Sequence, residues 1–329
     1  MADSGKPVGG ATAVADRPVP TAAPTGMGVR RPRWLGPRQR VRALQIGFLV
    51  PAVVYMVLFF GYPIVQNTIM GFQDYTTRTF VTGVAPWVGL SNYGAVVSSS
   101  IFTKAALNTA LFTVGSIAGQ FVIGLALALF FRRRFPLSRV FRSLLLLPWL
   151  IPLVATSAVW RWILDQDNGV LNTFLSTLHI ANHPGWLSST SLALIAVIGV
   201  NIWVGIPFNT TILYGGLQEI PEELYEAASL DGATGWRAFR WITWPQLRPV
   251  VTVVLVLGVV YTLKVLDVIL GLTNGGPANS TQTIATQSYN LSFQQFNFGQ
   301  GAALGNLLIV VSLAFAILYL RVSRRAVDD

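Results

Sequence analysis

Two ionisable side chains, Lys264 and Asp267, lie inside a long apolar stretch of this sequence. A spacing of three residues would put them on nearly the same face of a helix. Ionisable groups at membrane depth are costly, and they usually face a bundle interior or a wet cavity. Two interpretations follow: either the two groups pair with each other and lock the packing, or they contribute to a path for a polar solute.

The residue patterns of common enzymes are missing. A P-loop that cradles ATP phosphates needs a lysine in a G-x-x-x-x-G-K-[S/T] run, and Lys6, Lys104 and Lys264 all lack that context. The apolar segments also contain no paired carboxylates and no nucleophile elbow. We therefore expect that the chain is not an enzyme and that energy comes from another subunit.

A metal site is not expected either. His179 and His183 have the i, i+4 spacing that could bring two imidazoles together on a helix. However, Pro184 indicates that a helix stops there, and no third ligand is apparent. Solvated loop histidines are the favoured interpretation. Because the chain has no cysteine, disulfides and thiolate metal sites are excluded.

The composition is typical of a polytopic membrane protein, with 53% hydrophobic and 11% charged residues. A net charge of +10 could indicate nucleic acid as a partner. The basic residues, however, fall in short segments that flank apolar stretches, as membrane orientation requires. We interpret the charge as topology and expect no nucleic-acid binding.

The pattern predicts an all-α integral membrane protein with six transmembrane helices. The spans are predicted at about 43–70, 105–131, 143–163, 192–217, 250–272 and 301–320, with a cytoplasmic loop at 218–249. Arginines cluster before the first span, after the second and after the sixth, which places both termini in the cytoplasm. Residues 1–42 are expected to be a disordered, basic cytoplasmic tail, because their first part has no apolar period.

Gly115 and Gly119 form a G-x-x-x-G pattern in the second predicted span. This pattern can bring two membrane helices close together. Small residues are common in membrane helices generally, so the alternative is that no interface depends on it.

The loop between the fourth and fifth predicted spans has its own helical signals. Pro221 suits the first position of a helix, which should run to about Leu230 and end at Gly232. A second short helix is predicted from Gly235 until Pro245 stops it. Each is shorter than the ~12 to 15 residues at which an isolated helix becomes marginally stable in water, so the pair must pack on something else.

The same loop contains the run E-A-A-x-x-D-G-A, which closely resembles the signature of permease subunits of binding-protein-dependent ABC importers. The match is carried by Glu226, Ala227, Ala228, Asp231, Gly232, Ala233, Gly235 and Pro245. In that family the loop is a coupling helix that sits in a cleft of the ATP-hydrolysing subunit. The resemblance implies that residues 43–325 form the transmembrane permease domain and that the loop residues from Glu226 to Gly235 couple it to the ATPase.

The resemblance extends to the sugar path of maltose-type permeases. Their W-x-G-x-P-[aromatic] segment matches Trp203, Gly205, Pro207 and Phe208, and spacing back from L-T-N-G-G-P aligns Tyr261, Thr262 and Val265 with their other sugar contacts. Aromatic faces suit sugar C–H surfaces, and small polar groups suit hydroxyls. Val265 stands where a polar residue would be expected. The candidate path is Gly205, Phe208, Tyr261, Thr262, Lys264, Val265 and Asp267.

The resemblance implies a sugar importer in the bacterial cytoplasmic membrane, with a disaccharide such as trehalose or maltose as substrate. Its implied partners are a second homologous permease, two cytoplasmic ATPase subunits that bind ATP and Mg, and an external solute-binding lipoprotein, with no cofactor in this chain. Two other classes remain open. A gradient-driven secondary transporter or channel predicts an inverted repeat and charge relays across several spans. A membrane-embedded assembly protein is the third possibility.

Overall fold

The computed structural model describes residues 37–133, 135–180 and 183–328. Within these ranges the chain is helical, and its only β-type pairings are isolated bridges. The predicted all-α fold is therefore confirmed. Most of the predicted tail lies outside the described residues, but its last residues, from Pro37 on, already belong to a helix.

The chain divides after Met56 into two units. The described part of the first unit is helix α1 (Pro37–Met56), which contains Pro51 in its interior. In the second unit the helical path goes on through a π-turn, η1 (Val57–Gly61), and α2 (Tyr62–Met70). Apolar helix from Leu44 to Met70 is long enough to cross a membrane, as the first predicted span requires.

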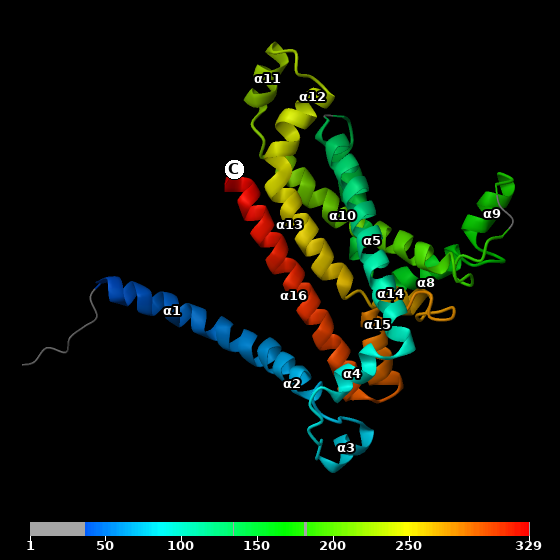
Figure 1. Cartoon of the computed structure of the whole chain (residues 1–329). Coiled ribbons are helices and arrows are strands. Elements are labelled where there is room, and N and C mark those ends of the chain that lie inside the picture. Colours follow the sequence, from blue (N-terminus) through cyan, green and yellow to red (C-terminus); the bar gives the residue numbers. More distant parts are fainter. Residues whose placement is uncertain (1–36, 134, 181–182, 329) are drawn as a thin grey trace, which may run out of the picture. The chain divides into compact units, whose positions relative to one another are not determined.

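The second unit contains the other helices. In chain order they are α3 (Thr77–Thr82), α4 (Ser91–Val97), α5 (Ser100–Arg132), α6 (Ser138–Leu145), α7 (Leu147–Leu150), α8 (Leu153–Ile163), α9 (Val170–Thr177), α10 (Ala193–Gln218), α11 (Glu222–Leu230), α12 (Trp236–Ala238), η2 (Phe239–Thr243), α13 (Trp244–Leu263), α14 (Asp267–Leu272), α15 (Ile284–Tyr289), η3 (Asn290–Gln294) and α16 (Phe298–Asp328). The loop helices α11 and α12 lie at one end of this unit, and α4 and α15 lie at the other (Figure 1).

In the described residues five helical segments are long and apolar enough to span a membrane, and a sixth is present if one bent pair counts as a single span. The bent pair is Ser138–Leu150 with Leu153–Ile163, which meet at 97°. It occupies the third predicted span, 143–163, which is therefore a broken helix. Pro152 explains the break, because a proline forces the residue before it into an extended conformation, and Ile151 has a ψ of 130°.

The segment after the loop also differs from the prediction. Pro245 does not end a helix, since helical structure continues from Trp236 to Leu263. The π-turn η2 lies just before this proline, so the backbone there already departs from the i→i−4 hydrogen-bond pattern that Pro245 would interrupt. The predicted fifth span, 250–272, is in turn divided between α13 and α14.

Helices α5 and α10 pack against each other more extensively than any other pair in the described chain. A Cβ atom at Gly115 would lie 3.3 Å from the Ile198 side chain, and one at Gly119 would collide with Ile202. The G-x-x-x-G pattern of α5 therefore faces α10. This agrees with the interpretation that the pattern brings two helices close together. In this contact Gln120 Nε2 donates a hydrogen bond to the backbone oxygen of Asn201 at 2.9 Å.

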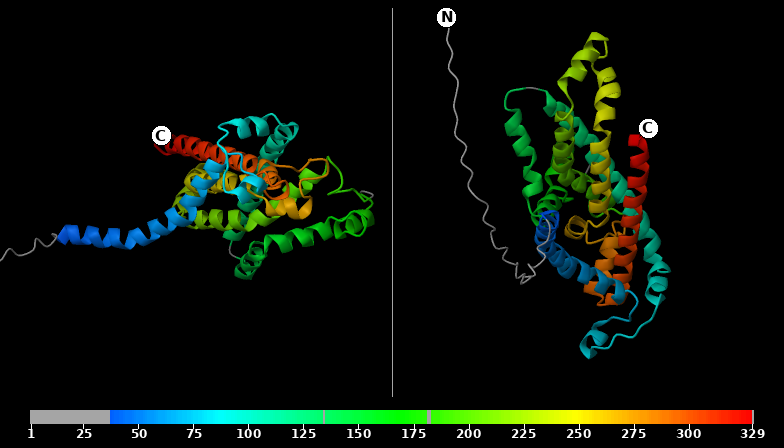
Figure 2. Two further views of the ribbon diagram at one scale, coloured as in Figure 1. Left: turned by 90° about the horizontal axis from the view of Figure 1, so that it is seen from below. Right: turned by 90° about the vertical axis from the view of Figure 1, so that its left-hand side faces the viewer.

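Two apolar clusters stabilise the unit at the two ends of α10. One joins Phe112 of α5 to Val197 of α10 and to Ile269 of α14. The other, at the loop end, is formed by Ala128, Leu213, Leu217, Ile220, Leu247, Val251 and Val254. Helix α13 also packs alongside α16, and the right-hand view of Figure 2 shows the two running together.

The glycines of α5 and α10 allow a direct test of the close contact. A Cβ atom at Gly124 would lie 2.8 Å from the Asn209 Cβ and 3.2 Å from the Thr210 backbone nitrogen, whereas one at Gly199 would meet nothing within 4 Å. We predict that Gly124→Ala lowers the free energy of unfolding by about 1 to 3 kcal/mol, because the α10 backbone must move. Gly199→Ala should be neutral or slightly stabilising, since alanine is the better helix former.

The measurement is thermal unfolding of both variants in one detergent. Equal midpoints for the two variants would show that α5 and α10 do not approach as closely as described.

Candidate functional site

The predicted coupling helix is present as α11 (Glu222–Leu230), with Pro221 immediately before its first residue. Glu222 and Glu223 lie in the first turn, where carboxylates oppose the positive end of the helix dipole. The helix lies at the end of the unit at which α10 ends and α13 begins (Figure 1). A nine-residue helix of this kind depends on its surroundings, because it is too short to be stable alone.

Most of α11 and the bend after it are exposed. Glu226, Ala227, Asp231, Gly232 and Gly235 are exposed, while Ala228 and Ala233 are half-buried. Leu230 is 89% exposed and Trp236 is 72% exposed. Large apolar side chains that stand together on a tip typically mark a surface that another protein covers.

Two glycines shape the bend. Gly232 has a φ of 73° and Gly235 a φ of 55°, and a Cβ atom at either would meet open space. Glycine is therefore needed at these positions for its backbone conformation, since other residues rarely adopt a positive φ. The turn is closed by the backbone, with the Ala233 N–H donating to the Ala228 oxygen at 2.8 Å. The Asp231 carboxylate makes no hydrogen bond among the described residues.

Three residues of the predicted path lie together. The rings of Phe208 (α10) and Tyr261 (α13) meet edge-on, with centroids 6.2 Å apart. The Nζ atom of Lys264 lies 4.9 Å from the centre of the Tyr261 ring. Trp149 of α7 packs on Phe208 from another side, at 6.0 Å. The sequence did not single out Trp149, which lies in the short helix α7 that packs against α10.

Of the other residues of the predicted path, three are packed inside the permease and one is exposed. A Cβ atom at Gly205 would overlap the Gln120 side chain, so this glycine is required by the contact between α5 and α10. Thr262 is 4% exposed, and Val265 packs against the apolar cluster around Phe112. Asp267 is exposed in the first turn of α14.

Lys264 and Asp267 do not share a helix face, which corrects the sequence prediction. Helix α13 ends at Leu263, and Lys264 is the first residue outside its regular turns. Leu266, with a φ of −122°, separates it from α14. The two charged groups therefore lie on different elements, and the ammonium group of Lys264 faces the Tyr261 ring instead.

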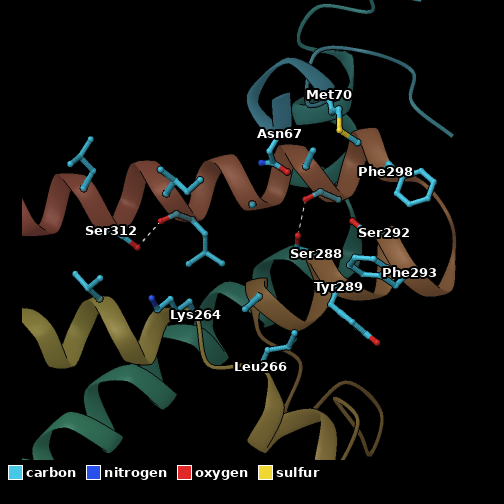
Figure 3. A pocket seen from close by; sticks show the side chains of 18 of the residues that line it. Asn67, Met70, Lys264, Leu266, Ser288, Tyr289, Ser292, Phe293, Phe298 and Ser312 are labelled. Atoms are coloured by element: carbon cyan, nitrogen blue, oxygen red, sulfur yellow. Dashed lines mark hydrogen bonds between the residues drawn. The ribbon is translucent and has the colours of Figure 1, made fainter. Parts of the chain in front are cut away.

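A cavity of about 820 Å³ opens between α13 and α16 beside Lys264 (Figure 3). Its wall is largely apolar, and two of its hydroxyls already bond to backbone. Ser288 donates to the Gly301 oxygen and Ser312 to the Leu308 oxygen, both at 2.8 Å. Lys264, Tyr289 and Ser292 are among the other polar groups with which this mainly apolar wall could bind hydroxyls of a solute.

The histidines predicted to be loop residues are not on one helix. Helix α9 ends at Thr177, before His179, and residues 181–182 lie outside the described chain. No group of three or more potential metal-binding side chains occurs in the described ranges.

Comparison with known proteins decides the family. Residues 120–328, which include α11 and both helices of the aromatic contact, match the family of the binding-protein-dependent transport system inner membrane component. The chain belongs to this family. The resemblance drawn from the E-A-A-x-x-D-G-A run is thereby confirmed, and the protein is a multi-pass inner-membrane permease.

Individual relatives cover most of the permease. It is 33% identical over 289 residues to the trehalose/maltose transport system permease protein of Thermococcus litoralis, covering 87% of this chain and 96% of that protein. It is 31% identical over 287 residues to the diacetylchitobiose uptake system permease protein of Streptomyces coelicolor, covering 85% of this chain and 87% of that one. Its fold matches a chain of a bacterial ABC transporter that imports the polysaccharide alginate, with a TM-score of 0.76 and 24% identity over 87% of this chain and 96% of that chain.

The geometry of Gly232 in the permease gives a test of the bend. Gly232→Val places a β-branched residue at a φ of 73°, at a cost of about 1 to 2 kcal/mol, so α11 should change direction. We expect ATP hydrolysis and transport by the assembled complex to fall together. Gly232→Asn is the matched control, because asparagine tolerates this conformation, and it should retain most of both activities. Normal activity of the valine variant would mean that the angle of α11 is unimportant.

Proposed function

We propose that this permease imports a sugar, most simply a disaccharide such as trehalose or maltose, using ATP hydrolysed by separate subunits. The observation that carries the proposal is the exposed signature helix α11, which offers a partner a surface at one end of the spans. The names of the two relatives support the substrate class, since trehalose, maltose and diacetylchitobiose are all disaccharides.

The partners that we propose follow from what this chain exposes. Two cytoplasmic ATPase subunits, which bind ATP and Mg, would receive α11 of this chain and the equivalent helix of a second, homologous permease. Tyr261 is 53% exposed, so the path residues are open on one side and would be enclosed by that second permease. An external solute-binding lipoprotein would deliver the sugar. No cofactor is assigned to this chain.

The orientation that we propose places α11 in the cytoplasm. Arg132 ends α5 with its guanidinium 4.0 Å from the Tyr225 ring of α11, so the arginine cluster after α5 and the loop lie at one end. The C-terminal end of α16 lies at that same end (Figure 1). By the positive-inside rule this end faces the cytoplasm, and the N-terminal arginines would place the other terminus there too.

The sugar path that we propose runs past the Phe208 and Tyr261 rings. Aromatic faces pack on the C–H surfaces of a sugar ring, and the Lys264 ammonium is placed to donate to hydroxyls nearby. The cavity in Figure 3 is the less suitable place, because its wall is mainly apolar.

The proposal is tested with the purified complex in lipid vesicles. Uptake of labelled trehalose or maltose should require ATP on the side of the vesicle membrane that corresponds to the cytoplasm. It should also require the binding protein on the opposite side. Uptake that follows a proton or sodium gradient without ATP would identify a secondary transporter instead. If several labelled disaccharides were not taken up either with ATP and binding protein or with an ion gradient, sugar import would be rejected.

Substitutions in the aromatic pair locate the path. Phe208→Ala or Tyr261→Ala should weaken the apparent affinity for sugar about fivefold, because each removes a ring contact worth on the order of 1 kcal/mol. Phe293→Ala, which removes a ring from the wall of the cavity in Figure 3, is the control and should leave the affinity unchanged. The reverse pattern in the concentration dependence of uptake would move the sugar to that cavity.

A further inference from the structure

One side chain of the exposed helix α11 reaches into the body of the permease. Tyr225 is half-buried and packs against the apolar cluster at the loop end of α10 and α13. Its neighbours Leu224 and Glu226 are exposed. Tyr225 therefore attaches α11 to the spans through its side chain.

Two further contacts hold Tyr225, one on the face of its ring and one at its hydroxyl. The guanidinium carbon of Arg132, the last residue of α5, lies 4.0 Å from the centre of its ring. Its hydroxyl shares a hydrogen bond of 2.8 Å with the Thr243 hydroxyl. Thr243 ends the π-turn η2 and is only 3% exposed. One tyrosine thus joins α11 to the end of α5 and to the start of α13.

Such a joint matters because α11 is short and is followed by a bend at which it could rotate. It has nine residues, and the glycines at 232 and 235 follow it directly. A push on its exposed tip would be absorbed by rotation at this bend unless a side chain fixed the helix to the spans. Cation–π contacts and buried hydroxyl hydrogen bonds are both directional, so together they resist rotation as well as separation.

We propose that Arg132, Tyr225 and Thr243 form a clamp that makes α11 move as one body with α5 and α13. This inference rests on the proposed function and deepens it, by naming the positioning residues through which ATPase motion reaches the path. Helix α13 carries Tyr261, and α5 packs on α10, which carries Phe208. Motion of α11 is therefore delivered to both rings of the aromatic pair.

The experiment measures sugar transported per ATP hydrolysed by the complete complex in vesicles. Tyr225→Phe keeps the ring and removes the hydrogen bond, Thr243→Val removes the same bond from the other side, and Arg132→Gln removes the cation. Each should lower the ratio about two- to fivefold while the complex still assembles. Arg132→Lys should restore it, because an ammonium group also binds the ring face.

Two controls separate a clamp from general damage. Arg133→Gln removes an exposed neighbouring arginine, which lines one pocket together with Arg132 and Tyr225, and should leave the ratio unchanged. The double variant of Tyr225→Phe and Thr243→Val should be no worse than either single one, because both break one bond. A purely structural role would lower the amount of complex and leave the ratio intact.

The outcomes also separate this inference from the proposed function. If the unsubstituted complex shows no uptake that depends on ATP and binding protein, the proposed function fails. If it does show such uptake and the three variants keep its ratio, the clamp is overturned. A spin label on a cysteine at Leu230 gives a second measurement, and unchanged mobility of the label in Tyr225→Phe would also overturn it.

Discussion

The close contact between α5 and α10 is the constraint on which the other features of the permease depend. A bilayer core offers no water to polar groups, so a side-chain amide there must find its hydrogen-bond partners on its own or a neighbouring helix. Glycines on α5 admit α10, and Gln120 spans the contact by bonding to the Asn201 backbone and accepting a bond from Asn209 at 3.4 Å. The position of α10 then fixes both Phe208 and the start of the loop that leads to α11.

Much of the loop could be predicted from local rules, because its residues act through their own backbones. Pro221 lies one residue before the first position of α11, close to the predicted place, and the helix ends just before Gly232, which has a φ of 73°. Longer segments were less predictable, since tertiary packing decides whether a helix stops. Helical structure continues past Pro245 because a π-turn precedes it. Helix α13 ends at Leu263, although no glycine or proline there predicts the end.

The candidate path shows the same division. The resemblance to maltose-type permeases implied that Phe208 and Tyr261 line one path, and their rings meet edge-on with centroids 6.2 Å apart. It also placed Gly205 there, although that glycine serves the α5 contact. Arg132 and Tyr225 were not predicted, because an arginine after a span reads as an orientation signal and a tyrosine before E-A-A reads as part of the helix. The two residues are 93 positions apart in sequence, and only the structure shows that the Arg132 guanidinium lies 4.0 Å from the centre of the Tyr225 ring.

The proposed coupling role of α11 requires that this helix faces the side of the membrane where ATP is hydrolysed. The chain contains no cysteine, so single cysteines can be introduced at exposed Ser229 on α11 and at exposed Asn279 at the other end. The direct measurement is labelling of each in intact cells and in inverted vesicles with a thiol reagent that cannot cross the membrane. We predict that the cysteine at 279 reacts from outside and the one at 229 only from inside. Reaction of the cysteine at 229 from outside would contradict both the orientation and the coupling role of α11.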